Sequence, residues 1–516
     1  MNKYSDFLKT STKLSSFVRQ GVERECLRVD ANNKLSVQDH PKALGSKLTH
    51  PFITTDYSEN LLEYITGVFK SEKDLLSNLE DMHNFTYQNL EKDEYIWPWS
   101  MPAIVPENED DIKVAHYGKS NVGKLKELYR IGLGHRYGKS MQSIAGVHYN
   151  FSLSDEFWNE LKISLKTDES IQQIKDDAYF HLIRNYRRYS YILSYLFGAT
   201  PVVHESFLKN KKHKLEKLGN KTFGKEFATS LRMGGLGYTS NAQKEISICY
   251  NALPTYIKTL EAARLQSYPE YEKIGLKDES GHKQLNTNLL QIDNEFYSTI
   301  RPKNIAKSCE SALGALYDRG IEYIEVRLLD VNPFSPVGID LETMRFLHSF
   351  LLFCLFKDSP IITSSECHQI DENFSRIVND GRNPNLTINC QGKELPKDEC
   401  ILSLLEEIKG VAKLLGQEHI EALGIQKEKI KNPTLLPSSK IMKMLESGEA
   451  IDTYMASIAK LYKAAGMDQE TPSHWNEVAK KSLLDQEELE KDSLGFDDFL
   501  VDYFEQIKIK FKEDNA

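Results

Sequence analysis

The chain has 516 residues, of which 40% are hydrophobic and 27% are charged, so it has enough apolar material for a sizeable buried core. Acidic residues outnumber Lys and Arg by 75 to 65, which gives a formal net charge of −10. This balance argues against unspecific binding to nucleic acid or to an anionic membrane, and it favours small polar partners.

The cysteines and the apolar segments bear on the cellular location. The seven cysteines are scattered, with no C-x-x-C pair and no zinc-binding spacing, which favours a reducing compartment. The first twenty residues lack the features of a signal or transit peptide. The longest strongly apolar run, 346–356, is shorter than the roughly 20 residues that span a bilayer, and it predicts a buried helix. We therefore expect a cytoplasmic protein without membrane attachment.

Along the chain, the sequence pattern predicts strands and loops up to about Leu153, then a mixed middle part to about residue 395, and then a helix-rich tail. Segment 177–198 has apolar residues at helical spacing and predicts one long packed helix, whereas the basic run 209–221 predicts an exposed loop. Four short segments alternate in polarity as half-buried strands do: GVERECLRVD (21–30), NLLEYITG (60–67), IAGVHYNFSL (144–153) and GIEYIEVRLLDV (320–331).

These four strands carry unusual polar side chains. Residues two apart in a strand share a face, so the alternation predicts that each strand turns polar groups to one side. Glu23 shares a face with Glu25, His148 with Asn150, and Glu325 with Arg327, while Glu63 interrupts an apolar face between Leu61 and Ile65; the groups are thus Glu23, Glu25, Glu63, His148, Asn150, Glu325 and Arg327.

Two interpretations of these faces stay open on pattern alone. The Glu-rich faces could be the solvent side of a sheet, or they could line one site. Carboxylates that face one another repel unless cations lie between them, and oxygen ligands with one imidazole suit Mg²⁺ or Mn²⁺. A site at these faces would therefore hold divalent metal.

Two glycine-rich segments are weak candidates for phosphate binding. The run GKSNVGK (118–124) fits part of a P-loop, but Leu125 stands where Ser or Thr would reach Mg²⁺, and no buried strand precedes it. The run RMGGLGYTS (232–240) lacks the third glycine of a dinucleotide fingerprint. Any ATP phosphates would have to be held by metal ions and arginines.

Eight segments together closely resemble the proteobacterial glutamate–cysteine ligase family, collinearly from about residue 20 to 390: GVERECLRV, THPFITTDYSENLLEYIT, WPWSMP, YGKSNVGKLKELYRIGL, GVHYNFSL, ATSLRMGGLGYTS, LQIDNEFYSTIRPK and GIEYIEVRLLDVNPFSPVGI. The resemblance implies an α+β, glutamine synthetase-like fold, in which a curled antiparallel sheet forms a funnel wrapped by helices. It implies one catalytic unit over 1–516, with the substrate, metal and ATP sites in 1–395 and a helix-rich C-terminal part in 396–516.

The resemblance also implies the reaction and its partners. L-Glutamate, L-cysteine and ATP would give γ-glutamylcysteine, ADP and phosphate through a γ-glutamyl phosphate, as the first step of glutathione synthesis, with Mg²⁺ required. The partners would be these small molecules, with no nucleic acid and no membrane. The resemblance also leads us to expect feedback inhibition by glutathione. The 516 residues are too few to include the fused glutathione synthetase part of bifunctional relatives.

Matched motifs assign roles to individual residues. The resemblance implies that the metal ligands are Glu23, Glu25, Asp56, Glu63, His148 and Glu325; of these only Asp56 has no support from the strand pattern. Arg327 would stabilise the phosphoryl group and Arg232 would bind the α-carboxylate of glutamate, although the two roles could be exchanged. Gln142, Ile144 and Asn150 would line the glutamate pocket. The cysteine pocket would comprise Tyr57, Tyr129, Leu133, Tyr238 and Tyr297.

Three alternative functions compete with this prediction. A ligase of the same fold that uses another amine would differ only in the acceptor pocket. A glycoside hydrolase with paired carboxylates such as Glu23 and Glu63 would leave His148, Arg232 and Arg327 without a role. A metal-dependent binding module would bind Mg²⁺ without ATP turnover.

Overall fold

An antiparallel sheet forms the centre of the molecule. The computed structural model describes residues 4, 7–8, 13–209, 211–236, 241–244, 246–491, 495–509 and 511. Within them, the largest sheet has seven strands in the order β11-β12-β5-β1-β3-β2, with β4 paired to β1, and all of these pairs are antiparallel. Its strands are β1 (Val18–Val29), β2 (Ile53–Thr55), β3 (Leu61–Ile65), β4 (Tyr95–Ile96), β5 (Val147–Leu153), β11 (Ile300–Lys303) and β12 (Tyr323–Leu329).

The four predicted strands are confirmed as β1, β3, β5 and β12, which are neighbours in this sheet. The register places Glu25 opposite Glu63, Glu23 opposite His148, and Glu325 opposite Asn150. Because directly opposed residues point to the same face, the predicted polar side chains gather on one side of the sheet. Three smaller sheets comprise β6 (Val202–His204), β7 (Glu216–Gly219) and β8 (Thr222–Gly224), then β9 (Lys277–Asp278) and β10 (Gly281–His282), then β13 (Thr387–Cys390) and β14 (Lys393–Pro396).

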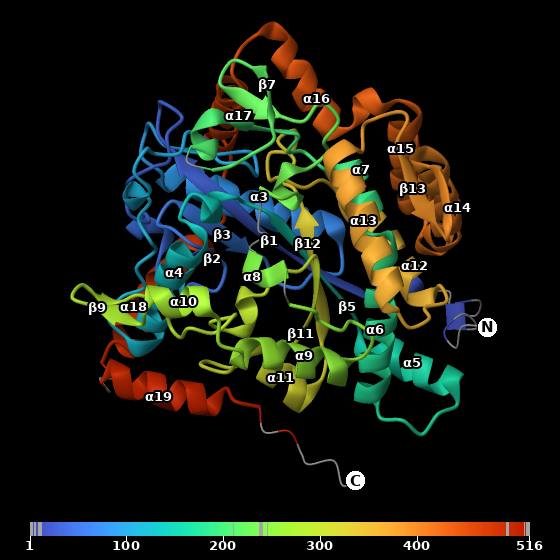
Figure 1. The fold of residues 1–516 in the computed structure, drawn as a ribbon, viewed down its shortest axis with the longest axis horizontal. Helices are drawn as coiled ribbons and strands as arrows, with labels where there is room; N and C mark the ends of the chain where they lie inside the picture. The colour runs from blue at the N-terminus through green and yellow to red at the C-terminus, as the bar shows by residue number, and fades with distance from the viewer. Residues whose placement is uncertain are drawn as a thin grey trace.

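Helices surround the sheet (Figure 1). The predicted buried helix over 346–356 is confirmed as part of α12 (Leu341–Phe356), which packs against α3, α6, α14 and α15. The helices of the N-terminal and middle parts are α2 (Leu14–Phe17), α3 (Glu72–Asn89), α4 (Asn121–Tyr137), α5 (Asp155–Leu165), α6 (Ile171–Tyr189), α7 (Tyr191–Phe197), α8 (Asn241–Lys244), α9 (Leu253–Leu265), α10 (Pro269–Ile274), α11 (Ala312–Arg319), α12 and α13 (Ser364–Asp380).

The tail is rich in helices, as predicted. It contains α14 (Lys397–Leu415), α15 (Gln417–Lys431), α16 (Pro437–Met444), α17 (Ile451–Met467), α18 (His474–Leu489) and α19 (Phe496–Gln506). One hydrophobic core includes residues from both parts of the chain, for example Phe17, Phe350 and Leu404. The division into functional parts at residue 395 stays a prediction.

Three sequence predictions differ from the structure. The expected helix over 177–198 is broken at Ser190 into α6 and α7. The basic run 209–221 is not only loop, because it contains β7. The N-terminal part holds two long helices, α3 and α4, whose first turns are capped by the Ser71 and Ser120 hydroxyls, which accept from the amides of Asp74 and Gly123.

The structure also pairs two cysteines. Cys390 in β13 and Cys400 in α14 form a disulfide, with their Cα atoms 6.4 Å apart. The sequence spacing gave no sign of this pair, and the cytoplasmic location inferred from scattered cysteines stays a prediction. No helix in the described part of the chain is long and apolar enough to cross a membrane.

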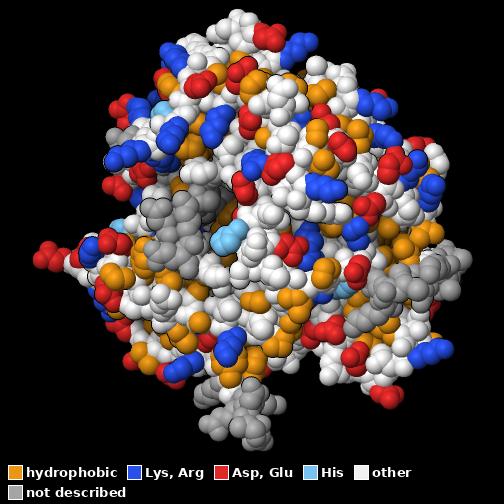
Figure 2. Space-filling model, turned by 45° about the vertical axis from the view of Figure 1, so that its right-hand side comes forward, with side chains coloured by type: hydrophobic (Ala, Val, Ile, Leu, Met, Phe, Trp, Pro, Cys, Tyr) orange, Lys and Arg blue, Asp and Glu red, His pale blue; other side chains and the backbone are white. Residues whose placement is uncertain are grey.

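The face drawn in Figure 2 is hollowed near its centre, and its acidic and basic side chains are interspersed. Positive charge is therefore not gathered on this face into the continuous basic surface that binds the nucleic-acid backbone.

We expect His50 to make the fold sensitive to acid. This buried residue precedes β2, and its Nδ1 accepts from the amides of Phe52 and Ile53 at 3.1 and 2.8 Å. Burial lowers the pKa of His50 to about 4. The unfolded chain binds a proton at His50 below pH 6.5, whereas the folded protein does so only near pH 4, so stability falls as the pH drops through this window.

Replacing His50 by Asn should reduce this acid sensitivity, because the amide oxygen can accept the same bonds but does not titrate. Between pH 7 and pH 4.5 the variant should lose up to about 3 kcal/mol less stability than the original protein. Thermal melts at both pH values test this, with the exposed His213 replaced by Asn as the control. Parallel losses of Tm in all three proteins would contradict it.

Candidate active site

His148 lies at the centre of the polar face of the sheet. Its Nδ1 is 3.2 Å from Oε2 of Glu23 and 4.0 Å from Oε1 of Glu325, and its Nε2 is 3.4 Å from Oε1 of Glu25. These side chains come from β5, β1 and β12, and all four are largely buried. Three carboxylates thus converge on one imidazole, and those of Glu23 and Glu325 form with it a group that could hold a metal ion.

Glu63 and Glu25 are held in surroundings that disfavour their charge. Burial raises the pKa of Glu63 well above its ordinary value, and the charges of Asp56, Glu23 and Glu25 raise it further. Burial likewise raises the pKa of Glu25, although His148 opposes the shift. Glu25 also accepts from the amide of Gly146 at 2.7 Å, which fixes one of its oxygens. These two carboxylates would ionise readily only beside additional positive charge.

The other two acids have cations beside them. Burial alone would raise the pKa of Glu325, but Arg327, Lys303 and His148 hold it well below its ordinary value. For Glu23 burial and Glu325 also act to raise the pKa, yet the hydrogen bond and charge of His148, together with Lys303, lower it overall. Negative charge therefore exceeds positive charge around Glu25 and Glu63, whereas neighbouring cations nearly balance the charges of Glu23 and Glu325.

This donor set fits a hard divalent ion. Carboxylate oxygens with a single imidazole are ligands that Mg²⁺ or Mn²⁺ accepts, and an added ion would supply the positive charge that Glu25 and Glu63 require. Asp56 follows β2 directly and raises the pKa of Glu63, so it lies close enough to contribute another oxygen.

A cavity opens beside the acidic residues. It is lined by Glu25 and Asp56 from the acidic side, and by residues of α4, the 141–143 turn and the segment before β11. Of the residues predicted from the sequence, the cavity brings together Glu25, Asp56, Tyr57, Tyr129, Leu133, Gln142, Tyr297 and Arg327. Predicted metal ligands and predicted cysteine-pocket residues therefore share one space.

The two predicted arginines are joined through the backbone. Arg327 Nη1 donates to Glu325 Oε2 at 3.0 Å, so the two residues that were predicted to share a face of the strand are hydrogen-bond partners. Arg232 Nη2 donates to the backbone oxygen of Arg327 at 3.0 Å, and its Nη1 lies 3.6 Å from Asp330. Its guanidinium also lies against Gly146, where an added Cβ would come within 2.1 Å of Nη2. Arg232 is thus placed to support Arg327.

Among the buried polar atoms without a hydrogen-bond partner within the described residues are three that belong to residues predicted to form the site. They are Nε of Arg327, Oδ1 of Asn150 and the hydroxyl of Tyr57. A buried polar atom without a partner is unfavourable, so such atoms mark places where a bound molecule can restore hydrogen bonds. Two of the three residues, Arg327 and Tyr57, line the cavity.

Some predicted residues lie elsewhere. Ile144 is fully buried and is not among the residues that line the cavity. Asn150 faces the acidic cluster and donates to Glu23 at 2.9 Å. Tyr238 falls outside the described residues.

Several charged residues at the site were not predicted from the sequence. Arg130, Glu295 and Arg301 line the cavity, and Lys303 lies 3.7 Å from Glu325. Arg301 and Lys303 alternate along β11, the same signal that identified the acidic strands. Pro302 between them is unusual for a strand, but β11 is an edge strand, where proline is tolerated.

Comparisons with known proteins agree on one family. Residues 6–377 match the family model described as glutamate-cysteine ligase. Glutamate–cysteine ligases of Pseudomonas paraeruginosa (strain PA7) and Hahella chejuensis are 44% and 43% identical to this chain, over alignments that cover 94% of it and 93% and 95% of those proteins.

Two solved structures share the architecture. The crystal structure of a glutamate–cysteine ligase from Francisella tularensis in complex with AMP matches with a TM-score of 0.90 and 37% identity, covering 95% of this chain and 98% of that one. A bifunctional glutathione synthetase from Pasteurella multocida matches with a TM-score of 0.73 and 23% identity, covering 96% of this chain and 60% of that one, and it shows likeness of fold alone.

Proposed function

Because this chain belongs to the glutamate–cysteine ligase family, we propose that it joins the γ-carboxylate of L-glutamate to the amine of L-cysteine, with conversion of ATP to ADP and phosphate. The observation that carries this proposal is the convergence of Glu23, Glu25 and Glu325 on His148, beside a cavity that contains Arg327. A carboxylate does not accept an amine until one oxygen becomes a leaving group, and an acidic site that can hold cations suits that activation.

We propose that Mg²⁺ is held by Glu23, Glu25, Asp56, Glu63, His148 and Glu325, with Mn²⁺ as an alternative ion. The metal, when bound, would supply positive charge to the ATP phosphates and to the γ-carboxylate. The support is the buried excess of negative charge around Glu25 and Glu63. The adenine contacts stay unassigned.

The reaction gathers negative charge as the γ-phosphoryl group moves to glutamate and as phosphate later leaves. Arg327 is suited to stabilise this charge, because its guanidinium is buried and fixed by Glu325, and its Nε has no partner in the described part of the chain. Its pKa is raised, chiefly by Glu325 and Glu25 against the effect of burial, so it stays charged. Fixed donors need no reorganisation during the reaction.

The substrates would occupy the cavity. Gln142 in the cavity lining and the buried Arg232 behind it are proposed to bind glutamate, with Ile144 and Asn150 also shaping its pocket from outside the lining. Tyr57, Tyr129, Leu133, Tyr238 and Tyr297 are proposed to bind cysteine. The position of Tyr57, Tyr129 and Tyr297 around one space supports an aromatic acceptor pocket, in which alignment of the amine contributes to the rate.

Phosphate release tests the proposed function. With ATP and Mg²⁺, phosphate should appear when both glutamate and cysteine are present, together with one equivalent of γ-glutamylcysteine. Turnover with another amine and none with cysteine would favour the alternative ligase. Mg²⁺ binding without any turnover would favour a binding module.

Removing the hydroxyls of Tyr57 and Tyr297 should weaken cysteine binding. The Tyr57 hydroxyl has no partner among the described residues, and that of Tyr297 donates to Sδ of Met233 at 3.3 Å. If they bind the cysteine carboxylate, each change to Phe should raise the KM for cysteine about tenfold or more, since a hydrogen bond to a charged group contributes roughly 1.5–3 kcal/mol. Steady-state kinetics for both substrates test this.

The KM for glutamate serves as the internal control, because activation of its γ-carboxylate precedes amine attack. Folded variants with an unchanged KM for cysteine would assign these tyrosines to packing.

Other properties follow from the same proposal. We propose that the sheet is the curled sheet of a glutamine synthetase-like fold, and that residues 1–516 act as one catalytic unit; its antiparallel strand order supports this. Feedback inhibition by glutathione remains a prediction.

A further inference from the structure

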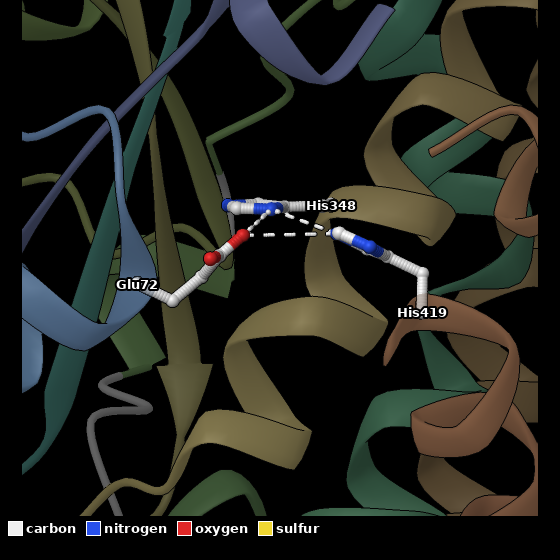
Figure 3. A group of neighbouring side chains, drawn as sticks. All are labelled: Glu72, His348 and His419. Atoms are coloured by element: carbon white, nitrogen blue, oxygen red, sulfur yellow. Dashed lines mark hydrogen bonds and ion pairs between the residues drawn. The ribbon is translucent and has the colours of Figure 1, made fainter. Parts of the chain in front are cut away.

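A second cluster of side chains that could hold a metal ion lies on the other face of the sheet. Glu72 at the start of α3, His348 in α12 and His419 in α15 point toward one another (Figure 3). They lie far apart in sequence, and no motif predicted their meeting. The cluster is outside the cavity described above, because His348 contacts Tyr149 of β5, which faces away from the side that carries His148.

The distances within the cluster match those of a tetrahedral metal site. Oε1 of Glu72 and Nδ1 of His348 are 2.9 Å apart, Nδ1 of His348 and Nε2 of His419 are 3.4 Å apart, and Nε2 of His419 and Oε1 of Glu72 are 3.7 Å apart. Ligand atoms about 2.0–2.1 Å from a tetrahedral ion are separated by about 3.3 Å. The three atoms therefore already stand at about the right separations around one point.

A second layer of hydrogen bonds orients the central histidine. The carbonyl oxygen of the Gln20 side chain lies 3.0 Å from Nε2 of His348, and it also accepts from the Tyr149 hydroxyl at 2.7 Å. Without an ion, Nδ1 of His348 donates to Oε1 of Glu72. With a metal ion on Nδ1, the remaining ring proton of His348 would lie on Nε2 and be donated to the Gln20 oxygen. A carbonyl or carboxylate that accepts from the far nitrogen is the usual support of a metal-binding histidine.

The protonation states also suit a metal. Burial lowers the pKa of His419 to about 4, with His348 as the next cause, so its imidazole is neutral at pH 7. Although burial opposes it, the hydrogen bond and charge of His348 lower the pKa of Glu72 to about 2, so its carboxylate is ionised. Two nearby cations, Arg345 and Lys73, are both paired with Glu418, at 2.6 and 3.2 Å.

We propose that Glu72, His348 and His419 bind one divalent transition-metal ion, for which Zn²⁺ is the best match. Two imidazoles and one carboxylate are a zinc-type ligand set, whereas the oxygen-rich acidic face suits Mg²⁺. Glu72 is partly exposed, which leaves a path for the ion and a fourth position for water. The ion would tie α3, α12 and α15 to the back of the sheet.

Cobalt binding tests the site. Full-length protein is stripped with a chelator and titrated with Co²⁺ in excess Mg²⁺, while the visible absorption of tetrahedral Co²⁺ is followed, and Zn²⁺ is then added in competition. We expect one equivalent of absorbing Co²⁺ that Zn²⁺ displaces. His419→Gln and Glu72→Gln should each weaken Co²⁺ binding about 100-fold or more.

Two control variants separate this site from others. Glu63→Gln changes the acidic face and His213→Gln removes an exposed imidazole, and both should keep the cobalt signal. Circular dichroism verifies that each variant is folded. If the His419 variant does not fold, the Glu72 variant still tests the site. The proposal is overturned if the unaltered protein gives no tetrahedral signal, or if Glu63→Gln abolishes the signal that His419→Gln and Glu72→Gln retain.

Discussion

Replacing Glu63 by Gln should lower the ligase turnover by about a thousandfold or more while the protein stays folded. The carboxylate of Glu63 lies in the acidic cluster, and the loss of a charged ligand beside the transferring phosphoryl group removes several kcal/mol of stabilisation. The measurement is kcat as a function of Mg²⁺ concentration.

The same substitution should leave stability intact without Mg²⁺. Because burial and neighbouring acids raise the pKa of Glu63, ionising it disfavours the folded state, and stability from this group falls as the pH rises above its ordinary value of 4.5. Gln resembles the protonated form and avoids that loss. Thermal melting should therefore show an equal or higher Tm for Glu63→Gln without Mg²⁺, and a smaller rise of Tm on adding Mg²⁺.

A matched control is Glu322→Gln, because that carboxylate lies next to β12 but pairs with Lys175 at 3.0 Å, outside the cluster. It should keep near-normal turnover. An active Glu63→Gln enzyme with unchanged Mg²⁺ dependence would remove Glu63 from the metal ligands.

Replacing Arg327 by Lys should mainly lower kcat, by about a hundredfold. Nη1 of Arg327 donates to Glu325, whereas its Nε has no partner in the described residues and can donate to the charge that develops in the reaction. A lysine ammonium cannot satisfy both directions at once, and a single lost donor to such a charge typically lowers turnover 10²–10³-fold.

Replacing Arg232 by Lys should instead mainly raise the KM for glutamate, if that guanidinium binds the α-carboxylate. Steady-state kinetics with varied glutamate separate the two effects, and Arg319→Lys at a partly exposed ion pair with Glu310 serves as the control. The reverse pattern would show that the two arginines have exchanged roles. Because Arg232 donates to the backbone of Arg327, we expect some loss of kcat in both variants.

The acidic face was predictable because its signal is local. Alternation within a strand identifies which side chains share a face, and Glu23, Glu25, Glu63, His148 and Glu325 needed no knowledge of the strand order. The polar faces of neighbouring strands lie on the same side of the sheet, because the apolar faces must all be buried on the other side.

The cavity was less predictable, because its walls come from segments that only the tertiary structure brings together. Tyr57 and Tyr129 could be named only through the family resemblance, and Arg130 was missed although it lies next to Tyr129 in sequence. Asp330 was missed because its importance depends on its contacts with Ser230 and Thr200, from distant segments. The cluster of Glu72, His348 and His419 had no local signal at all.

The central position of β1 limits how this segment of the gene can change. The strand pairs with β3 on one side and β5 on the other, with Glu23 and Glu25 facing the site and Val22 and Arg24 facing the core. Adding or removing a single codon within β1 would turn the acids into the core and the apolar residues into the site. Substitutions in β1 can be tested one at a time by selection, whereas changes of length are restricted to the loops at its ends.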